Sequence, residues 1–180
     1  MTRSRKILIG IFLVVAIIVV AVGALYIFLP PMVHIEESLT INKSLDDVWT
    51  FVTDVKNIEK MSQNVIEVVP TAERRLVMGS QFQQIRLIHG NRNPQTVTIV
   101  AYEEKKKYIT KTALFDVDVF YTYAYTPIDG GHTMLTLTKE AHAKGLEKIL
   151  LLLLRHLFTA PEHDGGHIQI LKHAVEEEVR

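Results

Sequence analysis

The residues best suited to catalysis or metal binding lie close together near the C-terminus, where the sequence reads PEHDGGH. His163 and His167 are four positions apart, so both imidazoles can face one ion on a helix, and Asp164 adds a carboxylate. A zinc ion usually takes three or four protein ligands, and the other histidines show no ligand spacing. We therefore predict no metal and no other cofactor. Asp164 and His167 remain candidates for acid–base chemistry or for binding a polar group.

Two interpretations of Asp164 and His167 stay open at this level. On a continuous helix both residues fall on the inner face, where they form a polar handle within an apolar pocket. Against continuity, residues 159–162 (TAPE) have the form of a capping box with proline in the first turn. The glycine pair at 165–166 weakens a helix further, and both side chains then lie in a solvated break. We predict a long C-terminal helix that is kinked or restarted at this capping box.

An apolar stretch, LEKILLLLLRHLF, covers residues 146–158 immediately before these groups. A membrane span needs about 20 apolar residues, so this shorter and charged stretch predicts a helix with one buried face. A helical wheel places Leu150, Leu153 and Leu157 on that face, opposite Arg155, and we expect these three leucines to line a cavity. The two leucines beside Arg155 face outward. They are compatible with membrane or partner contact and equally with ordinary surface exposure.

A series of strand-like stretches supplies the opposite wall of the expected cavity. They cover residues 64–71, 81–89, 94–103, 108–115, 117–126 and 134–141, with glycine- and asparagine-rich turns between most of them. Side chains two positions apart share a face of a strand. We therefore predict that the ligand-facing side chains of the sheet are Ile85, Leu87, Val97, Ile99, Tyr121, Tyr123, Leu135 and Leu137. The tyrosine hydroxyls either bind a ligand or simply reach solvent.

The elements before this series are a strand and a pair of helices. Residues 33–41 alternate as a strand, and Ser44 is placed to cap a helix whose first turn contains two aspartates. Trp49, the single tryptophan, falls on the apolar side of that helix and should pack in the core. A second short helix covers residues 56–61. The order of strand, helix pair, antiparallel strands and final helix predicts an α+β fold.

The N-terminus has the pattern of a membrane anchor. Residues 7–29 carry no charge, and as a helix they would extend about 34 Å, enough to cross a bilayer core. A cleaved signal peptide is the alternative, but no small-x-small site follows the apolar stretch. Arg3, Arg5 and Lys6 precede it, so the positive-inside rule predicts a cytoplasmic segment 1–6, a transmembrane helix 7–29 and a domain 33–180 outside the cytoplasm.

Three stretches resemble the SRPBCC superfamily, which includes START-like lipid-transfer domains and polyketide cyclases. They are SLTINKSLDDVWTFVTDVKNIEKM, the run of hairpins from AYEEKKKYITKTALF to GGHTMLTLT, and the amphipathic C-terminal helix. The resemblance implies a helix-grip fold, in which a curved antiparallel sheet of about six to seven strands wraps around a long C-terminal helix. It also implies a cavity for a lipid, sterol or polyketide, but it carries no catalytic motif that can be transferred residue by residue.

These observations favour a membrane-anchored module that binds a hydrophobic small molecule or lipid without catalysis. The alternatives are a cyclase- or hydrolase-type enzyme that uses pocket Asp, His or Tyr residues, and a scaffold that binds only protein. We assign no catalytic residue. A nucleic-acid partner is not expected, because the chain has 20 basic and 20 acidic residues and no basic face. The oligomeric state and the ligand are not determined by the sequence.

Overall fold

The computed structural model describes residues 3–28, 32–62, 64–70, 74–88, 90–114, 117–143 and 166–179. Its helices are α1 (Arg3–Phe28), α2 (Leu45–Val52), the 3-10 helix η1 (Val55–Met61) and α6 (His167–Glu178). Its strands are β1 (Met32–Ile41), β2 (Val65–Pro70), β3 (Gln81–Ile88), β4 (Asn91–Glu103), β5 (Lys107–Leu114), β6 (Val117–Ile128) and β7 (His132–His142).

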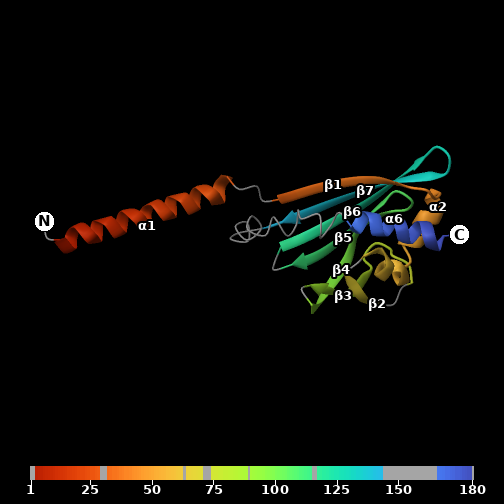
Figure 1. The fold of residues 1–180 in the computed structure, drawn as a ribbon, viewed down its shortest axis with the longest axis horizontal. Coiled ribbons are helices and arrows are strands. Elements are labelled where there is room, and N and C mark those ends of the chain that lie inside the picture. The colour runs from red at the N-terminus through yellow and green to blue at the C-terminus, as the bar shows by residue number, and fades with distance from the viewer. Residues whose placement is uncertain are drawn as a thin grey trace.

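The seven strands form one antiparallel sheet in the order β1-β7-β6-β5-β4-β3-β2. Strand β1 therefore pairs with the last strand of the chain, and the remaining neighbours are successive hairpins. Helices α2, η1 and α6 gather beside this sheet (Figure 1), and α6 contacts η1, α2 and β1. The predicted α+β class and the predicted curved antiparallel sheet are confirmed.

Helix α2 begins where the sequence predicts it. The Ser44 hydroxyl accepts a hydrogen bond from the backbone N–H of Asp47 at 3.3 Å, which satisfies one of the free donors of the first turn. The apolar side of α2 is buried, and Trp49 is only 4% exposed. Its ring contacts those of Tyr102, Tyr108 and Tyr125 at centroid distances of 5.5, 6.2 and 5.6 Å. The predicted core position of Trp49 is confirmed.

Replacing this side chain should strongly destabilise the domain. Trp49→Ala is expected to lower the free energy of unfolding by about 3–5 kcal/mol, because it leaves a cavity between α2 and three tyrosine rings. Urea unfolding followed by circular dichroism measures the change. Met134→Ala is the matched control, since Met134 is 38% exposed on β7 and should cost much less. Equal losses in the two variants would contradict this packing.

The C-terminal helix differs from the prediction. In the described residues it is the short helix α6, which begins at His167 after Gly166, with Ile168, Leu171 and Val175 buried. The C-terminal helix of the described residues is therefore short, the predicted long helix is not confirmed, and the glycine before α6 is consistent with a helix boundary at this point. The predicted kink and four predicted site residues lie outside the described residues: Leu150, Leu153, Leu157 and Asp164.

Helix α1 lies apart from the sheet (Figure 1) and is 26 residues long. The side chains described for it, residues 9–24, are mostly apolar and exposed. Within the described part of the chain, no helix has the combination of length and apolarity needed to cross a membrane. The anchor predicted for residues 7–29 is not confirmed and stays a prediction.

Candidate functional site

A cavity lies between the inner face of the sheet and the helices η1 and α6. Its volume is about 70 Å³, which is room for a few water molecules or a compact group and less than the roughly 300–1,000 Å³ of typical drug-sized sites. The apolar wall consists of Ile58, Met61, Leu76, Phe82, Val97 and Leu171. The polar and aromatic wall consists of Ser62, Gln84, Arg86, Tyr108, Thr110, Thr112, Tyr121, Tyr123 and His167.

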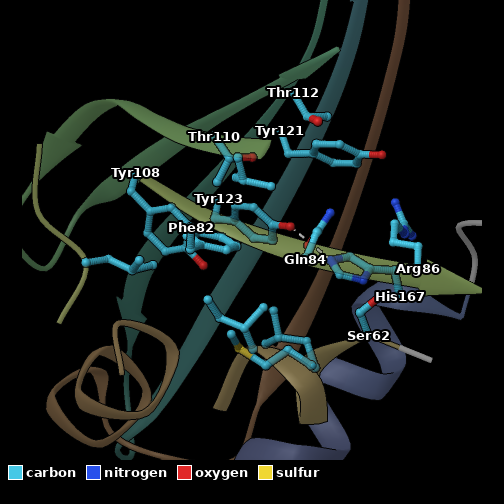
Figure 2. Close-up of a pocket in the computed structure, with 15 residues that line it drawn as sticks. Ser62, Phe82, Gln84, Arg86, Tyr108, Thr110, Thr112, Tyr121, Tyr123 and His167 are labelled. Atoms are coloured by element: carbon cyan, nitrogen blue, oxygen red, sulfur yellow. Dashed lines mark hydrogen bonds between the residues drawn. The ribbon is translucent and has the colours of Figure 1, made fainter. Parts of the chain in front are cut away.

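Strand β3 directs a face with two polar side chains toward the cavity. Phe82, Gln84 and Arg86 alternate along the strand and all line the cavity wall (Figure 2). Ile85 and Leu87 alternate with them on the other face, and Leu87 is 44% exposed. Their predicted ligand-facing placement is therefore wrong. The prediction chose the more apolar face of β3, whereas the pairing of Phe82 with Val97 of β4 directs the even-numbered side chains inward.

Strands β4 and β7 place their predicted residues on the correct face, but only one of them reaches the cavity. Val97 lines the wall. Ile99 and Leu135 are completely buried and Leu137 is 7% exposed, and all three belong to the hydrophobic core. Leu135 pairs with Tyr125 in the sheet, and Tyr125 packs against Trp49. These three residues pack within the core and do not line the cavity.

Tyr121, Tyr123 and His167 meet at the cavity, as the prediction placed them. The Tyr123 hydroxyl and Nε2 of His167 form a hydrogen bond of 3.0 Å between strand β6 and the first residue of α6 (Figure 2). Tyr108 stacks on the other side of Tyr123 at a centroid distance of 4.8 Å. His167 is therefore a cavity residue with a fixed partner and not a solvated surface side chain. Whether it binds a ligand stays a prediction.

The sequence reasoning missed several polar residues of the wall. Gln84 donates a hydrogen bond from Nε2 to Oε1 of Gln95 at 3.3 Å, and Arg86 lies beyond it on the same strand. Thr112 is only 8% exposed, yet its hydroxyl has no hydrogen-bond partner among the described residues. Their alternation with Phe82 and Thr110 is the signal in the sequence that could have placed them on the inner face.

Burial of two tyrosines changes their acidity. Burial raises the pKa of Tyr108 well above its ordinary value, and the neighbouring Tyr125 hydroxyl adds to the shift. Burial likewise raises the pKa of Tyr125. Both phenols therefore stay protonated at neutral pH, because removal of water disfavours the charged form. Neither is suited to act as a phenolate base.

These two tyrosines predict a loss of stability at high pH. In the unfolded chain each phenol ionises near pH 10, while in the folded domain Tyr108 and Tyr125 keep their protons. The stabilisation is fully present below about pH 10 and decreases above it, because the folded state then binds more protons than the unfolded state. Urea unfolding at about pH 9, 10 and 11 measures the decrease. A variant with both Tyr108→Phe and Tyr125→Phe should lose less stability, and an unchanged decrease would show that other groups cause it.

A sheet that packs on its helices around a partly polar cavity defines a class of small-molecule-binding domains. The family described as polyketide cyclase/dehydrase and lipid transport matches residues 32–160, and the chain belongs to this family. The expected SRPBCC membership is thereby confirmed. None of the curated proteins matches the chain.

Solved structures show the same fold at low sequence identity. Norcoclaurine synthase from Thalictrum flavum, in complex with dopamine and hydroxybenzaldehyde, has a TM-score of 0.60 at 13% identity, covering 81% of this chain and 85% of that one. The di-domain ARO/CYC StfQ of the steffimycin pathway has a TM-score of 0.63 at 18% identity, covering 81% of this chain and 52% of that one. A Thermus thermophilus protein has a TM-score of 0.62 at 14% identity, with 79% and 97% covered.

Proposed function

We propose that this protein binds a compact hydrophobic molecule with a polar end in the cavity between the sheet, η1 and α6. The observation that carries this proposal is that one part of the cavity wall is apolar and another part is polar. Phe82, Val97 and Leu171 present apolar surface, while Arg86 and His167 present polar groups to the same space. Ligand sites typically combine such an apolar lining with a few placed polar groups.

The size of the cavity favours a ring-sized ligand over a long-chain lipid. A volume of about 70 Å³ leaves no room for two acyl chains. The similar norcoclaurine synthase structure holds dopamine and hydroxybenzaldehyde, both of them small, as its name states. This likeness supports the proposal at the level of the fold, and the side chains of the cavity carry the argument for this chain.

Filling the cavity should abolish binding. The full-length protein in zwitterionic lipid nanodiscs should bind the fluorescent probe N-phenyl-1-naphthylamine saturably, with empty nanodiscs as the blank. Val97→Phe should weaken this binding by about tenfold or more, because the larger ring occupies the space that the ligand needs. Thr96→Phe is the matched control on the same strand, since Thr96 is exposed on the opposite face. The absence of saturable binding by the unaltered protein would remove the proposal.

A catalytic role is the second candidate, and one observation favours it. The 3.0 Å hydrogen bond between Tyr123 and His167 places two groups that exchange protons inside the cavity. General acid–base catalysis needs such a pair within reach of a bound substrate. In this alternative the protein is a cyclase- or hydrolase-type enzyme, and His167→Gln stops turnover of a co-purified ligand without preventing its binding. A scaffold that binds only protein is favoured by no observation.

We also propose that α1 anchors the domain in a membrane, with the N-terminus in the cytoplasm. The sequence of residues 7–29 carries no charge, and the apolar side chains described along α1 are exposed. Arg3, Arg5 and Lys6 precede its apolar part, which supports this orientation. A membrane position would place the cavity close to a source of hydrophobic ligands.

The orientation predicts access from outside. A protease added to intact cells, or to protoplasts where a wall intervenes, should digest the domain of residues 33–180. An epitope placed before Arg3 should stay protected until the cells are lysed. Protection of the domain with digestion only after lysis would reverse the orientation. Release of the protein from membranes by carbonate washing would contradict the proposed membrane anchor.

A further inference from the structure

We propose that the ligand of this cavity carries a carboxylate, which Arg86 binds. The inference rests on the proposed function and names the chemical class of the ligand: a compact apolar acid, not a neutral hydrophobic molecule. Three observations support it: the positive charge of the cavity wall, the absence of an ion pair between Arg86 and any described residue, and the Thr112 hydroxyl, which has no hydrogen-bond partner among the described residues.

The wall of the cavity is positive. Among the described residues that line it, Arg86 carries a permanent charge, His167 has an imidazole that can be protonated, and none is an aspartate or glutamate. Helix α6 begins at His167, and its first turn contains no acidic residue and no side-chain cap. The partial positive charge of a helix amino end adds to the same potential. The whole chain has a formal net charge of zero, so this sign is a local property of the site.

Arg86 differs from two other arginines of the domain because no described carboxylate is paired with it. Arg74 contacts the carboxylate of Asp54 at 3.3 Å, and Arg92, on the same hairpin as Arg86, contacts Glu67. Arg86 is half-buried, pairs with the uncharged Asn93 in the sheet and has no ion pair with a described residue. Arg86 lines the cavity together with Gln84 of the same strand (Figure 2). A planar guanidinium binds a carboxylate through two parallel hydrogen bonds, which gives both affinity and orientation.

Thr112 supplies an independent sign of a polar ligand. Its hydroxyl lines the cavity from β5, is more than nine-tenths buried and has no partner among the described residues. A buried hydroxyl without a hydrogen bond is costly, so a bound molecule or its water should satisfy it. In Figure 2 Thr112 and Arg86 approach the cavity from different strands. The ligand therefore meets polar groups from two different strands.

A pair of matched probes tests the inference. 2-Naphthoic acid and 2-naphthalenemethanol share one ring system and differ in charge, and each is titrated against N-phenyl-1-naphthylamine bound to the full-length protein in zwitterionic nanodiscs. The acid should displace the dye at about tenfold lower concentration than the alcohol, as a charge-assisted pair predicts. Arg86→Gln should remove this preference, so that the acid and the alcohol displace the dye at similar concentrations. Arg92→Gln is the control, because Arg92 is an exposed arginine on the same hairpin, and it should keep the preference.

The outcomes separate the two proposals. Equal displacement by acid and alcohol, or a preference that survives Arg86→Gln, overturns the carboxylate assignment and leaves hydrophobic binding standing. Displacement by neither probe, without saturable dye binding, overturns both. If Arg86→Gln does not fold, Arg86→Lys decides, because lysine keeps the charge without the paired donors. It should retain part of the preference for the acid, and complete loss of the preference in a folded, dye-binding Arg86→Lys protein also overturns the assignment.

Discussion

Burial of one face of the antiparallel sheet is the constraint on which the rest of this structure depends. Because side chains alternate between the two faces, covering the inner face with α2, η1 and α6 commits every second residue of each strand to the interior. Trp49 sets the position of α2 through three tyrosine rings on β4, β5 and β6. The same alternation that directs Tyr125 and Leu135 into the core directs Tyr123, Gln84 and Arg86 into the cavity.

The cavity is the place where this interior is not filled by its own side chains. Toward α2, the core closes completely around Ile99 and Leu135. Toward the beginning of α6, the strands bring an arginine, a glutamine and threonines into a space that an ordinary core would fill with aliphatic groups. Buried polar groups cost free energy unless they are satisfied. Local departures from core composition of this kind are typical of functional sites.

Family membership and cavity chemistry support different parts of the interpretation. Membership in the polyketide cyclase/dehydrase and lipid transport family, together with the similar solved structures, accounts for the fold of the sheet and its helices. It does not select a ligand, because one fold serves many chemistries. In our proposal Arg86 and His167 make this selection, and the hydrogen bond between Tyr123 and His167 orients the imidazole at the cavity wall. The proposed binding and the alternative catalytic role therefore both involve His167.

The amino-acid sequence by itself determined the α+β class, the capped helix that begins after Ser44, the core position of Trp49 and the inward faces of β4, β6 and β7. These features follow from local spacing and capping, which involve residues only a few positions apart. The tertiary structure alone decided which face of β3 is internal. The polar Gln84 and Arg86 line the cavity, whereas the sequence pattern predicts the apolar Ile85 and Leu87 there. The tertiary structure also placed Val97 on the cavity wall and Ile99 and Leu135 in the core away from it, and it began α6 at His167. These outcomes depend on strand register and helix packing between distant segments, which no local pattern contains.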